Sequence, residues 1–392
     1  MNDEVTLIIT LSLVVMLSPF FAKIFKVPTT PVEIVFGAIL GYVGLLHESH
    51  LFELVAEVGF LYLMFIAGTE VNIKSLLKTN ISLMKRILVY IALLYLFSIG
   101  FGLYFDLGKI FMVLLPLISV GLVAALSKEY GKTSWLTLSM TVGSIGEVVS
   151  IAVLTLTSAA LHVGVGIELV QVVVALSLFL IIIMLLFKGL QLFFWWFPEV
   201  TTALMPHDDN KEQDIRLSMG VFFILVGIML YLDLELAFGA FIAGMFIPTF
   251  FEHKHELPEK LGSFGFGFLV PVFFVYIGTS FHLEALMMDG LIIKALIIAL
   301  GMILMRVISA GVFVKELGHT KAVLMGLSHS MPLTLLIAMA TLAYHANSID
   351  QLHYYAFILA ALFQVLIVMI LIKLIYRFIP DALEHPQLEK IK

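Results

Sequence analysis

The 392-residue chain contains no cysteine, which excludes disulfide bonds, thiolate catalysis and cysteine-ligated metal sites. Charged residues are also scarce, because they make up 13% of the chain, whereas soluble domains carry roughly 25%. Hydrophobic residues make up 61% instead. These values exclude an ordinary soluble domain and predict a membrane protein. The net charge of −6 is modest, and nothing in its distribution indicates nucleic-acid binding.

Long apolar runs recur along the chain, and most could cross a hydrocarbon core of about 30 Å as a helix. Transmembrane β-strands alternate apolar and polar residues, whereas the runs here are continuously apolar, so a β-barrel is excluded. The sequence therefore predicts an all-α polytopic membrane protein. The first run lacks the basic region and cleavage site of a signal peptide, so we expect a retained span. Thirteen transmembrane helices are expected, at about residues 4–25, 31–46, 53–71, 84–104, 109–128, 133–158, 164–194, 214–232, 235–250, 262–281, 289–314, 320–345 and 352–378.

Basic residues are distributed unevenly between the loops. If the N-terminus lies outside, every Lys and Arg except Lys109, Lys294 and Arg306 falls on the cytoplasmic side. Loops rich in Lys and Arg stay in the cytoplasm. The pattern predicts an external N-terminus, a cytoplasmic C-terminus and an odd number of spans.

Two segments occur twice in the same order. Glu33–Gly41 (EIVFGAILG) returns as Glu235–Gly244 (ELAFGAFIAG), and Gly59–Leu76 (GFLYLMFIAGTEVNIKSL) returns as Gly267–Leu286 (GFLVPVFFVYIGTSFHLEAL). The copies are seven expected spans apart, and an odd offset makes the second copy enter the membrane from the opposite side. The arrangement predicts inverted repeats with a binding site between them. Helix packing alone explains the glycines, but it does not explain two matched segments in the same order.

The repeat predicts one membrane transport domain over residues 1–392. Residues 1–160 form the first repeat with spans 1–6, and residues 214–380 form the second with spans 8–13. Residues 161–213 contain the connecting seventh span and a polar linker, and residues 381–392 form a cytoplasmic tail.

Helix-breaking residues occur inside two matched spans, the fifth and the twelfth. Unwound backbone in a membrane must be buried or line a cavity, so a matched pair of breaks indicates a binding site. Two separate proline kinks are the alternative. The residues expected at the breaks are Pro116, Ser119, Val120 and Gly121 in the fifth span, and Ser328, His329, Ser330 and Pro332 in the twelfth.

Two charged residues are expected deep inside spans, Glu147 in the sixth and Arg306 in the eleventh. A charge at the bilayer centre costs at least about 2.5–3.5 kcal/mol, so both should face the interior and lie near each other. One interpretation is a structural ion pair between the two helices. The other makes Glu147 an exchangeable site for a proton or a monovalent cation, while Arg306 keeps its charge and biases it.

Other polar residues in or near the spans favour structural roles. Glu70 is read as a cap or gate, with ion binding as the alternative, and His329 as a buried core histidine, with proton relay as the alternative. Glu33 and Glu235 are expected to begin short helices, where a negative charge suits the helix dipole. Gln364 in the last span takes roughly the place that Glu147 has in the sixth.

The segments TPVEIVFGAILGYVGLL, VAEVGFLYLMFIAGTEVNIKSLL, LAFGAFIAGMFIP and FLVPVFFVYIGTSFHLEAL resemble the bacterial monovalent cation:proton antiporters. The closest branch contains the Kef-type potassium–proton exchangers and the NapA-like sodium–proton antiporters. The resemblance covers most of the chain. It implies thirteen helices, a scaffold domain that forms a homodimer, and a core domain with two crossed, broken helices that moves like an elevator.

The resemblance also implies residue roles. The family's essential acid falls on Glu147, its core lysine on Arg306, and its crossed breaks on Ser119–Gly121 and Ser328–Pro332. The sequence departs from the family pattern because Gly146 stands where a polar partner is usual, and because Arg replaces Lys. The second break also lacks a common Gly-Glu pair. These departures leave the ion selectivity open.

The expected function is exchange of Na⁺ or K⁺ for protons across the bacterial inner membrane by alternating access. The monovalent cation would bind Glu147, no other metal or cofactor is expected, and the partners are the lipid bilayer and a second copy of the chain. No nucleophile–base pair or phosphate loop indicates an enzyme. Two alternatives are a sodium-coupled organic-anion symporter of related fold and a non-transporting membrane subunit or sensor.

Overall fold

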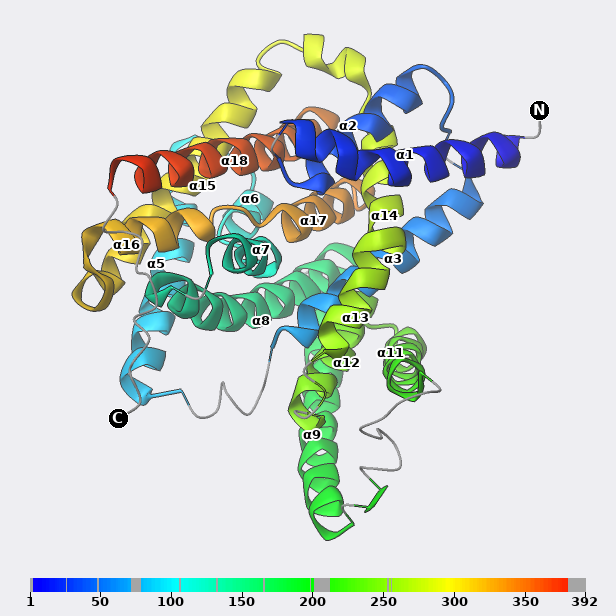
Figure 1. Ribbon diagram of the computed structural model, residues 1–392, viewed down its shortest axis with the longest axis vertical. Coiled ribbons are helices and arrows are strands. Elements are labelled where there is room, and N and C mark those ends of the chain that lie inside the picture. The colour runs from blue at the N-terminus through cyan, green and yellow to red at the C-terminus, as the bar shows by residue number, and fades with distance from the viewer. Residues whose placement is uncertain are drawn as a thin grey trace. The chain divides into compact units, whose positions relative to one another are not determined.

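The computed structural model describes residues 3–25, 27–47, 49–71, 79–105, 107–131, 133–164, 166–197, 199–200, 212–251, 254 and 256–379. The regular structure in these residues is helical, which confirms the predicted all-α class (Figure 1). Most of the predicted polar linker, residues 201–211, and the whole predicted tail lie outside the described residues.

The chain divides into two compact units, each built from two separate stretches of sequence. Unit 1 consists of Met1–Leu77 and Thr155–His282, and unit 2 of Lys78–Leu154 and Leu283–Lys392. Each unit therefore combines a stretch from the first half of the chain with one from the second half. Helix α8 (Ser134–Val163) contributes residues to both.

In unit 1, four helices pack in two pairs, α2 against α14 and α3 against α12. A buried apolar cluster that includes Leu7, Phe52 and Val275 holds α1, α3 and α14 together. The helices of this unit are α1 (Asp3–Phe25), α2 (Thr29–Tyr42), α3 (His50–Thr69), α9 (Ile167–Trp196), α11 (Gln213–Tyr231), α12 (Leu236–Phe250), α13 (Leu257–Phe264), the π-helical turn η1 (Gly265–Leu269) and α14 (Val270–Ser280).

Glycines bring the paired backbones of unit 1 into contact. A Cβ atom on Gly37 of α2 would lie 2.9 Å from the Cα of Gly278 on α14. A Cβ atom on Gly68 of α3 would likewise lie 2.9 Å from the Cα of Gly244 on α12. Each contact joins one short helix to one copy of the repeated GFL segment. The sequence repeat thus appears in the structure as two similar helix crossings.

We expect Gly68→Ala and Gly244→Ala to lower the stability of the protein, because an added Cβ must push two backbones apart. Overpacking of this kind costs about 1–3 kcal/mol. Gly220→Ala on α11 is the matched control, since its Cβ meets no atom within 4 Å. Thermal unfolding of the purified protein in detergent measures the difference. Equal Tm values for all three variants would contradict the close contacts.

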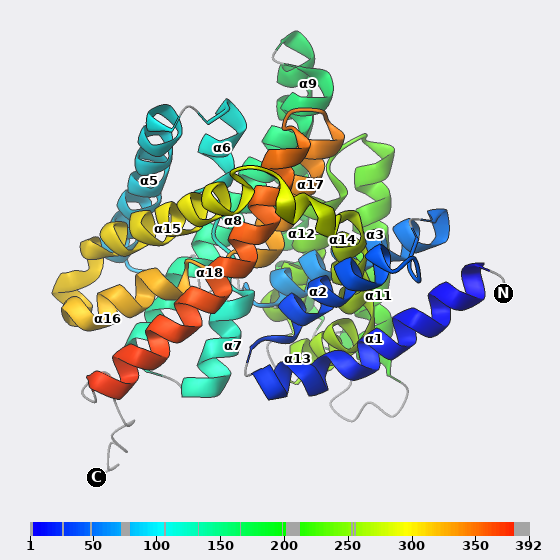
Figure 2. The ribbon, with the colours of Figure 1, turned by 90° about the horizontal axis from the view of Figure 1, so that it is seen from above.

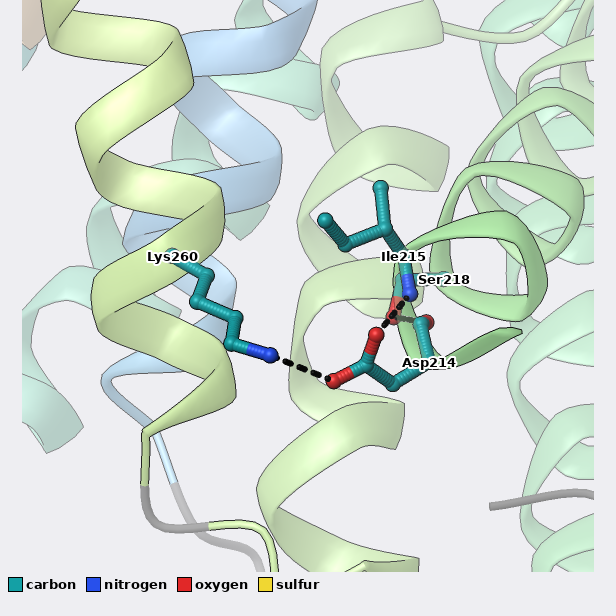
Figure 3. Close-up of polar contacts among 4 residues, drawn as sticks. All are labelled: Asp214, Ile215, Ser218 and Lys260. Atoms are coloured by element: carbon teal, nitrogen blue, oxygen red, sulfur yellow. Dashed lines mark hydrogen bonds and ion pairs between the residues drawn. The ribbon is translucent and has the colours of Figure 1, made fainter. Parts of the chain in front are cut away.

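A buried carboxylate ties the start of α11 to α13 in unit 1 (Figure 3). Asp214 is 1% exposed, and its Oδ2 atom lies 3.4 Å from Lys260 Nζ on α13. Its Oδ1 atom accepts a hydrogen bond from the Ile215 N–H (2.8 Å), and its main-chain oxygen accepts one from the Ser218 hydroxyl (2.7 Å). These contacts fix the N-terminal turn of α11, which has no side-chain cap.

Unit 2 contains the two helices that were expected to be broken. Its elements are α5 (Ile81–Tyr104), α6 (Lys109–Leu114), α7 (Gly121–Tyr130), most of α8, η2 (Leu283–Met287), α15 (Leu291–Ser309), η3 (Ala310–Phe313), α16 (Val314–Ser328), α17 (Leu333–His345) and α18 (Gln351–Phe378). Gly318 within α16 has a φ of 75°, a left-handed conformation that glycine adopts without strain. The turn there separates the predicted eleventh and twelfth spans.

The described residues contain nine helices long and apolar enough to cross a membrane. Three shorter apolar helices accompany them, at Thr29–Tyr42, Leu236–Phe250 and Leu335–His345. The protein is therefore a multi-pass membrane protein, and the expectation that the second and ninth spans are short is confirmed. The total of thirteen spans stays a prediction.

Candidate functional site

Two helices of unit 2 are interrupted where the sequence predicts it. The first break, residues 115–120, separates α6 from α7 and contains Pro116. The second break, residues 329–332, separates α16 from α17 and contains Pro332. Proline lacks the N–H group that a helix interior needs and clashes with the preceding turn, so it favours a break at both places.

Helix α8 holds the first break through neighbouring positions. The Ser119 hydroxyl donates to Glu147 Oε1 (3.2 Å), and the Ile118 N–H donates to Ser150 Oγ (2.8 Å). Gly146 makes room for the break, because a Cβ atom there would lie 2.5 Å from Ile118 Cδ1. Glu147 is 0% exposed, so its carboxylate faces protein and not lipid. The Ile118 side chain therefore occupies the space beside Gly146, where the family usually has a polar residue.

His329 anchors the second break to two helices. Tyr90 Oη on α5 lies 3.0 Å from His329 Nδ1, and Ser139 O on α8 lies 2.9 Å from Nε2. A carbonyl oxygen only accepts, so Nε2 carries the hydrogen, and in the neutral ring Nδ1 accepts from tyrosine. The Ser328 hydroxyl adds a contact of 3.2 Å to the Ser139 hydroxyl. The buried imidazole therefore has both nitrogens satisfied.

The two breaks meet beside one turn of α8. A Cβ atom on Gly143 would lie 3.0 Å from Val120 Cγ2 in the first break and 3.3 Å from His329 Nε2 in the second. Glu147 lies one helical turn beyond Gly143 on the same face of α8. The structure therefore brings the predicted break residues and the predicted acid together in unit 2.

Arg306 on α15 donates hydrogen bonds to buried carbonyl groups of the first break. Its guanidinium donates to Leu115 O (2.8 Å) and Leu117 O (2.5 Å), and to Met302 O (3.0 Å) on its own helix. Carbonyls at the end of a helix lack internal partners, so a buried arginine is well suited to them. Glu147 and Arg306 were expected to lie near each other, and the structure links them through the first break, which both side chains contact.

The remaining predicted residues lie at other places. Ser330 in the second break donates to Gly326 O (2.8 Å). Glu70 follows the last residue of α3 in unit 1, where its N–H donates to Ala67 O (3.2 Å), whereas the other predicted site residues belong to unit 2. Gln364 is fully buried on α18.

The two glutamates expected at helix starts differ. Glu235 is the N-cap residue of α12, and its carboxylate accepts a hydrogen bond from the Ser158 hydroxyl. Glu33 does not begin its helix, so that prediction is wrong. The helix α2 starts at Thr29 and continues through Pro31, because proline is tolerated in the first turn.

Sequence reasoning missed several groups that form the site. They are the carbonyl oxygens of Leu115 and Leu117 and the side chains of Tyr90, Ser139 and Ser150. The small residues of α8 do carry a signal, because Ser139, Gly143, Gly146 and Ser150 share one helical face around Glu147.

We expect Tyr90→Phe to destabilise unit 2, because it leaves the buried His329 Nδ1 without its donor. An unsatisfied buried acceptor costs about 1–3 kcal/mol. Tyr104→Phe on the same helix is the control, since Tyr104 is 83% exposed. The Tm of each purified variant reports the difference. A Tm for Tyr90→Phe equal to that of the control would show that the hydrogen bond contributes little.

A helical membrane protein whose two interrupted helices meet beside a buried carboxylate has the architecture of a secondary transporter. Comparison with known families defines it further. Residues 9–377 match the family described as "Sodium/hydrogen exchanger, transmembrane", so the chain belongs to the sodium/hydrogen exchangers. The family resemblance read from the sequence is confirmed.

Three proteins of known name are similar to this chain, at 18–26% identity. YjbQ of Bacillus subtilis is 25% identical over 403 residues, which cover 96% of this chain and 64% of YjbQ. The "Ammonium/H(+) antiporter subunit AmhT" of Alkalihalophilus pseudofirmus is 26% identical over 73% of this chain and 73% of AmhT. The sodium proton antiporter MjNhaP1 from Methanocaldococcus jannaschii has a similar structure, with a TM-score of 0.67, 18% identity and coverage of 97% of this chain and 99% of MjNhaP1. The chain thus shares the fold of MjNhaP1 and spans less than two thirds of YjbQ.

Proposed function

We propose that this chain exchanges a monovalent cation for protons across the membrane, and that Glu147 binds the two ions in alternation. The observation that carries the proposal is the position of Glu147, fully buried beside the first break and one turn from the meeting point of both breaks. A carboxylate binds either a proton or a small cation. Competition for this one group couples the two ions without further machinery.

The neighbours of Glu147 suit this role. The Ser119 hydroxyl is a hard oxygen ligand, as are the carbonyls of the first break that Arg306 does not contact, and Na⁺ and similar cations prefer such ligands. Arg306 cannot release its proton under ordinary conditions, so it supplies a fixed positive charge near the exchanging group. That charge favours release of the bound cation. It also balances the negative charge of the Glu147 carboxylate when no cation is bound.

Sodium is the first choice for the cation. The family and MjNhaP1 are both described by sodium, whereas AmhT is named for ammonium, and the Kef-type resemblance suggests potassium. We also propose an inner-membrane location, an external N-terminus and a homodimer. Glu147 and Arg306 together favour one-for-one, electroneutral exchange.

Dye-monitored proton flux in proteoliposomes tests the proposal. Separate gradients of Na⁺, K⁺, Li⁺ and ammonium are applied with and without a membrane potential, and empty liposomes correct for leak of neutral ammonia. We expect Na⁺-driven proton flux that does not change when the potential is clamped. Absence of flux with every cation would reject exchange, and flux that follows the potential would reject the electroneutral form.

A further inference from the structure

Four side chains of unit 2 carry buried polar atoms that have no hydrogen-bond partner among the described residues. These atoms are Arg306 Nε, Ser309 Oγ, both amide atoms of Gln364 and the hydroxyl oxygen of Tyr95. Arg306, Ser309 and Gln364 are each 0% exposed. The large majority of buried side-chain polar atoms are satisfied by protein or by ordered water, so several such atoms in one unit need an explanation.

Arg306 and Ser309 on α15 and Gln364 on α18 fall at one level along these two helices. The two helices pack together and run in the same direction (Figures 1 and 2). Near their first turns, Lys294 Nζ lies 2.9 Å from His353 Nε2, which fixes their register. Three turns further along each helix, this register places Gln364 beside Arg306 and Ser309. Gln364 also shares a helical face with His353, so it lies on the side of α18 toward α15.

Tyr95 lies at the same level on α5, which runs antiparallel to α15. The rings of Tyr90 and Phe313 are 5.8 Å apart, and a Cβ atom on Gly301 would lie 2.4 Å from the ring of Phe101. In two antiparallel helices, facing residues have numbers that add up to a nearly constant total, and both contacts give nearly the same total. The same register places Tyr95 opposite the turn of α15 that contains Arg306 and Ser309. The four orphaned groups therefore come from three helices at one depth.

We propose that Arg306 Nε, Ser309, Gln364 and Tyr95 form a binding site for ordered water inside unit 2. Water suits the cluster because it both donates and accepts, and the amide, the two hydroxyls and the Nε–H group require both. A cation does not suit it, since the guanidinium repels positive charge and most of the groups are donors. The bound water completes the hydrogen bonding of Arg306, whose other nitrogens already bind backbone carbonyls.

The proposed water contacts Arg306 on its Nε side, whereas the first break contacts a terminal nitrogen. The two terminal nitrogens of Arg306 contact backbone carbonyls, whereas its Nε–H contacts water that can reorient when the charge on Glu147 changes. This consequence rests on the proposed function. The water site itself does not, because it depends only on the packing of α5, α15 and α18.

The chain provides its own probes for this water. Met302 and Met305 are buried on the turns of α15 next to Arg306, and hydroxyl radicals made from bound water oxidise nearby methionine. The intact protein in nanodiscs is exposed to microsecond X-ray pulses, and mass spectrometry measures sulfoxide at each methionine. Met64 and Met339 are equally buried controls in other helices. We expect Met302 and Met305 to be labelled faster than both controls.

Two variants make the test specific. Gln364→Leu keeps a similar volume without polar atoms, and Ser309→Ala removes one hydroxyl with little change in packing. We expect either variant to reduce labelling of Met305 toward the level of Met339, and a normal Tm shows that the variant is folded. If Gln364→Leu fails to fold, Ser309→Ala alone decides.

Three results would overturn the proposal. One is slow labelling of Met302 and Met305 in the unaltered protein, and another is labelling that neither variant changes. The third is labelling that disappears when gluconate replaces chloride, which would identify an anion site. None of these readouts depends on ion transport, so the water site and the exchanger function can fail separately.

Discussion

Glu147→Gln is expected to abolish cation-dependent proton flux in proteoliposomes. Glutamine has nearly the same shape as glutamate and can still accept the hydrogen bond from Ser119. It cannot gain or lose a proton near neutral pH, and it offers a cation no negative charge. The fold should therefore survive while exchange falls to the level of empty liposomes.

Two further variants separate charge from shape at this position. Glu147→Asp keeps the carboxylate but shortens its reach, so we expect slower exchange that is still cation-dependent. Glu284→Gln removes an exposed carboxylate of unit 2 and should leave the flux unchanged. Full exchange by Glu147→Gln would show that another group carries the proton.

Arg306→Ala is expected to cause the largest loss of stability of any single change in unit 2. The guanidinium is 0% exposed and donates to three backbone carbonyls, two of them in the first break. Removing it takes the donor from the two buried carbonyls of the first break, Leu115 O and Leu117 O, and creates a cavity. Breaking buried charged contacts of this kind costs about 3–5 kcal/mol. We expect a clear fall in Tm and a shifted pH profile of any remaining transport.

Controls for Arg306→Ala come from the same unit. Arg86 pairs with Glu316 at a partly exposed site, so Arg86→Ala should cost no more than about 1 kcal/mol. Arg306→Lys keeps the charge but loses the fork that reaches two carbonyls, so its Tm should lie between the other two. An Arg306→Ala protein as stable as Arg86→Ala would mean that the first break is held by other contacts.

The helix breaks could be predicted because their causes are local. Pro116 and Pro332 interrupt backbone hydrogen bonding wherever they occur inside a helix, and flanking serine and glycine loosen the chain. Glu147 could also be singled out, since an isolated carboxylate in an apolar run needs an interior site. The structure places this acid against the first break and one helical turn from the point where the two breaks meet.

The partner of Arg306 could not be predicted from sequence. Every residue has a backbone carbonyl, so the sequence does not indicate that those of Leu115 and Leu117 accept hydrogen bonds from Arg306. A carboxylate such as Glu147 is the partner that composition suggests, yet a break in a helix supplies acceptors as well. The sequence also places the start of α2 two residues too late, because Pro31 fits the first turn of a helix as well as its first residue.

The repeat predicted that two pairs of segments correspond, but it did not predict which helices touch. The contacts of α2 with α14 and of α3 with α12 follow from close glycine approaches in three dimensions. The sequence shows the small residues without their partners. Tyr90 is another example, since only the fold places α5 next to the histidine of the second break.

The most direct test measures proton release when Na⁺ is added to the purified protein in weakly buffered detergent solution. If one carboxylate serves both ions, binding of Na⁺ must release a proton from Glu147, and affinity must weaken as the pH falls. We expect proton release that is absent in Glu147→Gln, with a Kd for Na⁺ that rises by up to about tenfold for each pH unit lost. Na⁺ binding that releases no proton, with a Kd independent of pH, would contradict a shared carboxylate.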